Sequence, residues 1–338
     1  MVKKIVFNAR NVYYGSGGTA RWSEEVLRML MSNKNCEVRV IAPRSSFFGN
    51  GWKAYFWEQL IVPFIVRKDE LLFSPSNLGT VLCKSQAVVI HDLLPLNGDK
   101  DFSKIYQFAL RVIYKPLFRR VKTLFTVSDG VRDQIIQLYP SVELKILVIG
   151  GGIREDTNYA IQKVFKDLNF CLIVGSHIRR KNLNFLLDIW SDVYLKTGCR
   201  LISTSRTVQD NVLTLHGSSG SHGPIWYTNI ADLTDEDLNS YYLNAKFVLQ
   251  PSTGEGFGLP LLEGMNLGTP FISNNVGIAR DISVGRSRVF PLIASIWTDY
   301  LVNELKDSKD VEDSEIQRFE ARKHTWGCVV DKILMAFD

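Results

Sequence analysis

Short apolar runs alternate with longer amphipathic segments along most of this 338-residue chain, and this alternation restricts its fold most strongly. A short apolar run is typical of a strand buried on both faces of a parallel sheet, and an amphipathic segment is typical of the crossover helix. The first half therefore predicts strands at Lys4–Asn8, Val38–Ala42, Leu71–Ser74, Ala87–His91, Thr123–Val127 and Ile146–Ile149, with helices near Thr19–Met31, Phe102–Lys115 and Asp129–Tyr139. The pattern indicates an α/β fold.

The alternation stops once, near residue 150. Gly150-Gly151-Gly152 closes a strand, and the polar stretch Arg154–Asn169 follows. Such segments separate domains, and the length fits about two domains, so we predict boundaries of 1–155 and 156–338. The second half predicts strands at Phe170–Val174, Arg200–Ser203, Phe247–Gln250 and Pro270–Ser273, and helices at Leu183–Leu195, at Asp235–Asn244 and from about Pro260. The terminal segment 310–338 is predicted to be helical, with no indication of where it packs.

Charge is distributed unevenly over the two predicted domains. The whole chain has a net charge of +5, which residues 1–155 (22 basic, 13 acidic) and 156–338 (18 basic, 22 acidic) divide into +9 and −4. The total is too small to indicate a nucleic-acid-binding protein. The basic first domain is the one expected to meet an anionic surface.

Other features predict a cytoplasmic protein. The five cysteines are odd in number and widely spaced, without a Cys-x-x-Cys pair, so we expect reduced thiols that are mostly buried. The apolar residues after Lys3 and Lys4 are too few for a signal peptide. No apolar run approaches the roughly 18 residues that a membrane span requires.

A glycine-rich segment, Gly15-Ser16-Gly17-Gly18-Thr19-Ala20, satisfies the dinucleotide fingerprint G-x-G-x-x-G/A. That fingerprint follows its strand directly, whereas Asn11–Tyr14 intervene here, and no acidic residue stands at Ala42–Arg44 to bind a ribose. Two interpretations remain open. Either Gly17 and Gly18 bring the backbone and a helix N-terminus to an anionic ligand, or the segment is a tight turn without a ligand.

The most informative segment is Pro251–Met265, which predicts a strand end, a loop with three glycines and a helix beginning near Pro260. Two carboxylates flank the predicted helix N-terminus. We place Glu263 in the first helical turn, where the helix dipole alone would favour it. Glu255 stands between glycines and is expected to face hydroxyl groups.

Glu255, seven further residues and Glu263, spanning Gly-Phe-Gly-Leu-Pro, resemble the signature of family 4 (group 1) glycosyltransferases, retaining enzymes with the GT-B fold. The resemblance extends along most of the chain, over Gly15–Ala20, Ile90–Leu96, Phe125–Ser128, Val174–Ser176 with Arg180–Leu183, and Asp232–Leu238. It implies two Rossmann-like domains facing each other across a cleft, the first on the acceptor side and the second binding a nucleotide sugar.

The resemblance also implies roles for individual residues. Glu263 would hold the ribose, Glu255 would approach the transferred sugar, and Arg180 and Lys181 would neutralise the diphosphate. His91 would contact the sugar or support the acceptor hydroxyl. Further donor contacts are implied for Gly256, Phe257, Gly258, Leu259, Gly17, Gly18, Gly175 and Ser176.

The chain departs from the family at two places. Ser176 stands where the family often has a diphosphate-binding Arg, and Gly150–Gly152 replace the usual Pro-Asn-Gly. Members of the family need no divalent metal, and we interpret the D-x-D pattern of Asp235–Asp237 as acidic residues of a helix start. No metal and no cofactor are assigned.

These features predict a retaining glycosyltransferase that moves a hexose from a nucleotide-diphosphate sugar to a glycolipid or oligosaccharide in surface polysaccharide synthesis. The alternatives are a nucleotide-sugar epimerase of the same fold and a nonenzymatic partner subunit. A Rossmann oxidoreductase fits least.

A membrane contact is a further expectation. Lys104, Arg111, Lys115 and Lys122 lie in one arc at 100° per residue, opposite Tyr106, Ala109, Leu110, Ile113 and Leu117, with Pro116 expected to interrupt the helix. This face suits anionic lipid headgroups, or is simply a solvated cationic surface. The aromatic residues Trp52, Tyr55, Phe56 and Trp57 either reach the same interface or fill the core.

Overall fold

The computed structural model describes residues 3–15, 17–45, 47, 51–97, 103–154, 168–175, 178–205, 224–306 and 310–337. They form two compact units. The first comprises Met1–Gly152 together with His324–Asp338, and the second comprises Ile153–Lys323. The sequence prediction was 1–155 and 156–338, with the packing of 310–338 left open.

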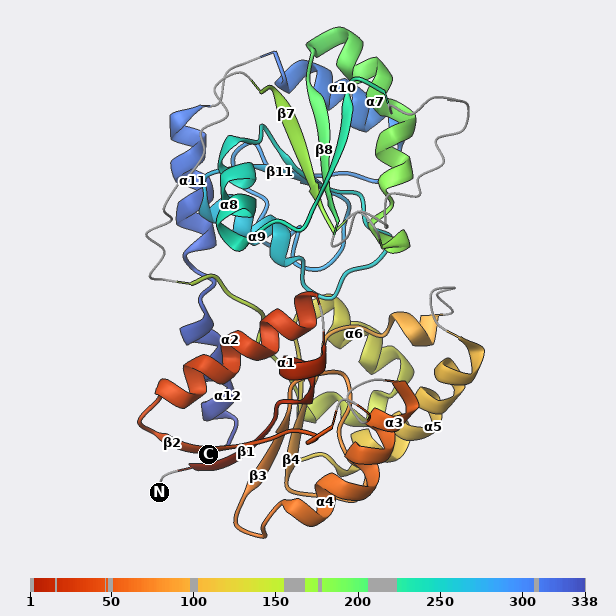
Figure 1. The fold of residues 1–338 in the computed structure, drawn as a ribbon, viewed down its shortest axis with the longest axis vertical. Coiled ribbons are helices and arrows are strands. Elements are labelled where there is room, and N and C mark those ends of the chain that lie inside the picture. The colour runs from red at the N-terminus through yellow and green to blue at the C-terminus, as the bar shows by residue number, and fades with distance from the viewer. Residues whose placement is uncertain are drawn as a thin grey trace. The chain divides into compact units, whose positions relative to one another are not determined.

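The first unit is built on a parallel six-stranded sheet of order β2-β1-β3-β4-β5-β6 (Figure 1). Its strands are β1 (Lys3–Asn8), β2 (Cys36–Ile41), β3 (Leu71–Ser74), β4 (Gln86–Ile90), β5 (Thr123–Thr126) and β6 (Ile146–Val148). Its helices are α1 (Arg10–Tyr14), α2 (Gly18–Ser32), α3 (Gly51–Phe56), α4 (Val62–Ile65), α5 (Lys104–Arg120), α6 (Asp129–Leu138) and α12 (Trp326–Met335). Every residue of β4 and β5 is buried, as the apolar runs predict for central parallel strands.

The second unit repeats this plan with the strand order β12-β11-β10-β7-β8-β9, again with parallel pairs (Figure 1). Its strands are β7 (Phe170–Val174), β8 (Arg200–Ser205), β9 (Tyr227–Ala231), β10 (Val248–Gln250), β11 (Phe271–Ser273) and β12 (Arg288–Val289). Its helices are α7 (Leu183–Thr197), α8 (Asp235–Asn244), α9 (Leu259–Asn266), α10 (Ala294–Glu304) and α11 (Val311–Ala321). The core between sheet and helices contains Trp190, Trp297 and Phe247, all fully buried.

Most predicted elements are confirmed to within a few residues, and two expectations were wrong: that Pro116 interrupts its helix, and that most cysteines are buried. Pro116 does not interrupt α5, which continues to Arg120. The segment 310–338 is helical as predicted, and its packing, which the sequence left open, is divided: α11 belongs to the second unit and α12 to the first, where Trp326 meets Trp22 edge to face at 6.2 Å. The cysteines are free, but only Cys171 and Cys199 are buried. Within the described ranges, none of the helices combines the length and apolarity that crossing a bilayer demands.

Candidate active site

The residues of the predicted site in the second unit lie where two neighbouring strands end. β7 is followed by Gly175 and by a short 3-10 turn, Arg179–Lys181. β10 is followed by the glycine loop and α9. Because Val248 of β10 pairs with Leu172 of β7 in a parallel sheet, both loops emerge from the same edge. The carboxyl edge of such a sheet is the usual ligand site of α/β folds.

Hydrogen bonds join these two loops. The backbone N–H of Thr253 donates to the carbonyl of Arg180 (2.8 Å), and the Arg180 guanidinium donates to the carbonyl of Gly254 (3.2 Å). The side-chain amide of Asn182 donates to the carbonyl of Pro251 (3.2 Å). The cationic turn and the glycine loop therefore form one connected structure.

Arg180, Lys181 and Glu255 form a cluster of ion pairs at this edge. Arg180 Nη1 lies 3.0 Å from Glu255 Oε2, and Lys181 Nζ lies 2.8 Å from Glu255 Oε1. The exposed fraction of the side chain is 7% for Glu255, 10% for Lys181 and 24% for Arg180. Two cations thus surround one carboxylate. Sequence reasoning selected all three residues, but it expected Glu255 to face ligand hydroxyls and missed this pairing.

Burial and charge act in opposite directions on the pKa of Glu255. Burial raises it, but the charges of Lys181 and Arg180 and the hydrogen bond from Lys181 lower it, and the net pKa is below the ordinary value for glutamate. Glu255 is therefore ionised at neutral pH. The cluster then carries a net charge of +1, which favours an anion beside it.

The loop backbone is fixed by packing. Phe257 and Leu259 are buried, while Gly258 has a φ of +105° and precedes α9. Ile278 N–H donates to the carbonyl of Phe257 (2.9 Å), and a Cβ on Gly277 (φ +59°) would lie 2.0 Å from that oxygen. Position 258 therefore requires glycine because of its positive φ. Position 277 requires glycine because of its positive φ and also because a Cβ would collide with the Phe257 carbonyl.

Glu263 lies in the second turn of α9, because the helix begins at Leu259. The prediction of a first-turn position was wrong, and the helix dipole does not account for this carboxylate. The hydroxyl of the buried Tyr242 donates to Glu263 Oε2 at 2.8 Å. Tyr242 holds the half-buried carboxylate in place, and sequence reasoning missed it.

Gln250 is another residue that sequence reasoning missed. It ends β10 directly before the glycine loop and is buried, yet neither amide atom has a hydrogen-bond partner among the described residues. Its Nε2 would lie 3.3 Å from a Cβ on Gly258, so the amide is directly against the loop. A buried amide normally has a partner, which makes Gln250 a candidate ligand contact. A polar residue ending an apolar strand was the available sequence signal.

The remaining predicted positions give mixed outcomes. Gly175 has a φ of +76°, and its N–H donates to Thr204 Oγ1 (3.2 Å). Ser176 lies outside the described residues. In the first unit, Gly17 has a φ of +78° and caps α2, while a Cβ on Gly18 would meet no atom within 4 Å. Helix α1 lies between β1 and this loop, so the loop does not follow its strand directly, as a dinucleotide fingerprint would.

His91 directly follows β4 in the first unit and is buried. Its Nε2 lies 2.7 Å from the carbonyl of Pro75, so this nitrogen carries the proton and donates it. Burial lowers the pKa of His91 to about 4. The ring also contacts Trp22 edge to face at 5.0 Å. His91 is therefore a neutral imidazole at physiological pH, with Nδ1 as its acceptor atom.

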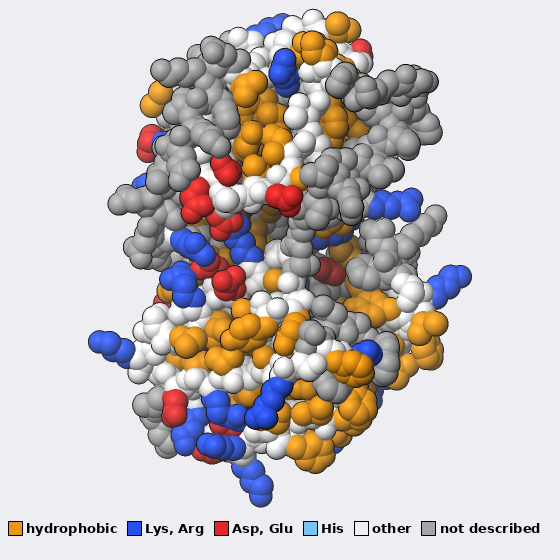
Figure 2. Space-filling model, viewed as in Figure 1, with side chains coloured by type: hydrophobic (Ala, Val, Ile, Leu, Met, Phe, Trp, Pro, Cys, Tyr) orange, Lys and Arg blue, Asp and Glu red, His pale blue; other side chains and the backbone are white. Residues whose placement is uncertain are grey.

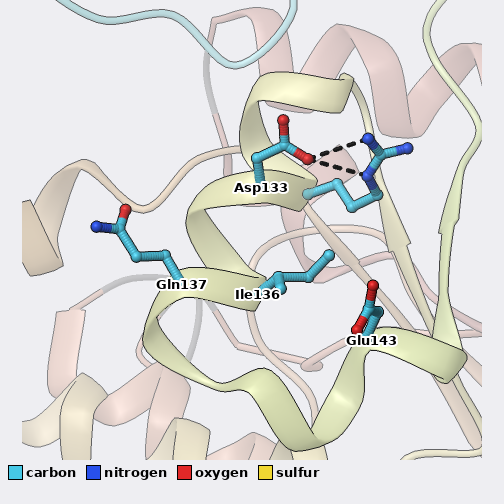
Figure 3. A pocket seen from close by; sticks show the side chains of 5 residues that line it. Asp133, Ile136, Gln137 and Glu143 are labelled. Carbon is cyan, nitrogen blue, oxygen red and sulfur yellow. Dashed lines mark hydrogen bonds and ion pairs between the residues drawn. The ribbon is translucent and has the colours of Figure 1, made fainter.

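A surface hollow on α6 contains none of these residues. Figure 3 shows Asp133, Ile136, Gln137 and Glu143 around it, on α6 and the turn that follows. The fifth lining residue, Arg132, pairs with Asp129 and Asp133, so its charge is compensated. We assign no role to this hollow.

Comparison with known proteins finds similarity to glycosyltransferases. Residues 169–302 match the family model for glycosyl transferases group 1. The chain is 27% identical over 278 residues to the O-antigen chain mannosyltransferase RfbU of Salmonella typhimurium LT2, covering 80% of this chain and 75% of that protein. It is 31% identical over 167 residues to O-antigen chain mannosyltransferase B of Escherichia coli, but this alignment covers only 46% and 44% of the two chains.

Among solved structures, the lipopolysaccharide glycosyltransferase WaaG superposes with a TM-score of 0.67 at 16% identity, covering 97% of this chain and 98% of WaaG. The two parallel-sheet units thus define a protein with the GT-B fold. Residues 169–302 match the group 1 glycosyltransferases, the family that the sequence resembles.

Proposed function

We propose that this protein is a retaining, metal-independent glycosyltransferase that moves a hexose from a nucleotide-diphosphate sugar to a glycolipid or oligosaccharide in surface polysaccharide synthesis. The observation that carries the proposal is the cluster of Arg180, Lys181 and Glu255 at the carboxyl edge of the second sheet. The O-antigen mannosyltransferases among its relatives support a surface polysaccharide acceptor and mannose as the hexose.

The cluster suits the leaving diphosphate. As the bond between the anomeric carbon and the diphosphate oxygen breaks, negative charge grows on that oxygen, and the largely buried Arg180 and Lys181 stabilise it. Glu255 holds both cations in position and approaches the sugar hydroxyls. Glu263, oriented by Tyr242, accepts hydrogen bonds from the ribose.

Retention requires the acceptor oxygen to attack from the face that the diphosphate leaves. The new bond to the anomeric carbon forms on that face, and the acceptor proton passes to an oxygen of the departing diphosphate. This route needs no carboxylate base. It agrees with a Glu255 whose lowered pKa makes it a weak proton acceptor.

A thermal-shift panel of nucleoside diphosphates and their hexose conjugates tests donor binding. A ligand at 100 times its dissociation constant raises the free energy of unfolding by roughly 2.7 kcal/mol. Stabilisation by a nucleoside diphosphate but not by the nucleoside supports the proposal, and equal stabilisation by both contradicts it. Hexose transfer to an added acceptor separates the transferase from an epimerase, which converts the donor without acceptor, and from a partner subunit, which converts nothing.

We also propose a peripheral contact with an anionic membrane through α5 and α4. Lys104, Arg111, Lys115 and Lys122 are exposed, although Arg111 also donates to the carbonyl of Leu96 (3.1 Å). Helix α5 also exposes Ile105 (83%), Phe108 (69%) and Val112, which at 100° per residue fall beside its basic residues, and α4 exposes Phe64 (83%). Figure 2 shows hydrophobic side chains gathered on the surface of this region, at the lower right.

Exposed apolar and basic side chains on one face are typical of helices that lie in a membrane interface. The aromatic residues divide: Trp57 is buried in the core, Phe56 is exposed, and the side chain of Trp52 lies outside the described residues. Co-sedimentation with phosphatidylglycerol vesicles tests the contact. The Phe64→Ser and Phe108→Ser double variant should lose binding, while the control Leu195→Ser, equally exposed on α7, should keep it.

A further inference from the structure

Asn182 joins the cationic turn Arg179–Lys181 to helix α7, and its backbone is left-handed, with a φ of +54° and a ψ of +43°. This conformation is unfavourable for most residues other than glycine, although Asn adopts it more readily than the others. On one side, the Lys181 N–H donates to the carbonyl of Ile178 (2.9 Å) and closes the turn. On the other side, the Asn182 carbonyl accepts from the Phe185 N–H (3.1 Å) and starts the helix. Asn182 therefore sets the direction of the cationic turn relative to α7.

The side chain of Asn182 does not do what an Asn before a helix ordinarily does. Such an Asn caps its helix, because its side-chain oxygen accepts from a backbone N–H of the first turn. Among the described residues, the Asn182 side chain makes no such bond to α7. Its amide nitrogen instead donates to the carbonyl of Pro251, 3.2 Å away and 69 positions later in the chain. The side chain therefore stabilises a neighbouring loop and not its own helix.

Pro251 directly follows β10 and begins the glycine loop that carries Glu255. The other hydrogen bonds described above between the turn and this loop involve Arg180 itself, through its carbonyl and its guanidinium. Asn182 is uncharged, so its bond to Pro251 fixes the spacing of the two loops without drawing on the cations. The cations are then held in place by a group that does not compete with an anionic ligand for them.

The ion pairs depend on this spacing. Lys181 directly precedes Asn182, so a change in the backbone at position 182 displaces Lys181 first. Its Nζ lies 2.8 Å from Glu255 Oε1, which is the length of a charge-assisted hydrogen bond. Cations fixed at a defined place stabilise developing negative charge best, because they need no rearrangement during the reaction.

We propose that Asn182 is a positioning residue for the two cations of this cluster. Its left-handed backbone and its bond to Pro251 hold Arg180 and Lys181 on Glu255, and thereby shape an anion site at this edge of the sheet. That the site receives the diphosphate of a sugar donor rests on the proposed function. That Asn182 holds the cations on Glu255 does not.

A double-mutant cycle on the free protein tests the positioning role without any ligand. Asn182→Gly removes the amide and still permits a positive φ, so the variant keeps the backbone conformation. If Asn182 holds the cations on Glu255, Glu255→Gln should lower Tm by only about half as much in the Asn182→Gly protein as in wild type. Equal losses in the two backgrounds overturn the proposal, because a merely structural Asn182 contributes independently of Glu255.

The matched control is Asn169→Ala. Asn169 Nδ2 donates to the carbonyl of Thr197 (3.3 Å), which is the last residue of α7, so this bond also joins a side-chain amide to a backbone carbonyl but at the opposite end of the helix. Asn169→Ala should leave the effect of Glu255→Gln on Tm unchanged. A reduction as large as that in Asn182→Gly overturns the proposal, because the coupling would then not be specific to position 182.

Calorimetric titration with inorganic pyrophosphate is the second measurement. Asn182→Gly should weaken pyrophosphate binding about fivefold, and Asn169→Ala should leave it unchanged. Where wild type binds pyrophosphate, equal affinity of Asn182→Gly overturns the proposal. If the cycle shows coupling but wild type binds neither pyrophosphate nor a nucleoside diphosphate, Asn182 keeps its role in the cluster and the proposal of a nucleotide-sugar donor fails.

Discussion

Replacing Glu255 by Gln perturbs the ion-pair cluster with almost no change in side-chain volume. In wild type the carboxylate lies 3.0 Å from Arg180 Nη1 and 2.8 Å from Lys181 Nζ. The variant keeps both cations but removes the negative charge that compensates them. Breaking a fully buried pair costs about 3–5 kcal/mol, but the Arg180 side chain is 24% exposed and water screens part of its charge. We therefore expect the free energy of unfolding to fall by about 2–3 kcal/mol.

Thermal unfolding of the second unit measures this loss. At roughly 2–4 °C per kcal/mol for a unit of this size, Glu255→Gln should lower Tm by about 4–12 °C. The control is Glu315→Gln: Glu315 is 66% exposed and pairs with Arg318, and its loss should cost about 0.5 kcal/mol or less.

The same variant should bind an anion more tightly, because its two cations are no longer compensated. A nucleoside diphosphate should therefore stabilise Glu255→Gln by more than it stabilises wild type, while hexose transfer falls. A Tm within about 1 °C of wild type, or a diphosphate effect smaller than that in wild type, would refute the electrostatic reasoning.

Three further predictions concern single positions. Burial lowers the pKa of His91 in the folded protein to about 4, so as the pH falls the unfolded state takes up a proton on this residue before the folded state does. The free energy of unfolding should therefore fall by about 3 kcal/mol between about pH 6.5 and pH 4. Denaturant titrations of His91→Asn over the same pH range should lack this contribution. Gly277→Ala places a methyl group against the Phe257 carbonyl and should destabilise the second unit by more than Gly198→Ala does. Gly198 has a similar φ, but no atom lies within 4 Å of the position that its Cβ would take. Differential scanning calorimetry of the two variants measures the difference. Glu263→Gln should weaken nucleoside diphosphate binding about tenfold or more in calorimetric titration, and unchanged affinity would remove its ribose role.

The strands were predictable because hydrophobic runs are local. Phe170–Val174 is buried almost throughout and is apolar at every position, so its sequence alone identified it. β9, Tyr227–Ala231, was missed because it is an edge strand of mixed polarity and only partly buried. Helices α3 and α10 were missed as well. The split of the tail depends on contacts such as Trp22 with Trp326, which no local pattern specifies.

The residues of the candidate site could be selected from the sequence, but the contacts among them could not. The spacing of Glu255 and Glu263 identified both carboxylates. Their partners depend on which strands lie side by side: Arg180 reaches Glu255 across 75 positions because β7 neighbours β10, and Tyr242 reaches Glu263 from α8. Gln250 was overlooked because its unpaired amide appears only once its burial is known.

The anomeric configuration of a transferred hexose tests the central claim most directly. The purified protein would be incubated with nucleoside diphosphate α-mannose and a lipid-linked oligosaccharide, with and without a metal chelator, and the product analysed by mass spectrometry and NMR. We predict an acceptor carrying one added mannose in the α configuration, in equal yield with chelator, and loss of that product in Lys181→Met. A β-linked product, a yield that depends on divalent metal, or free hexose without any acceptor product would contradict it.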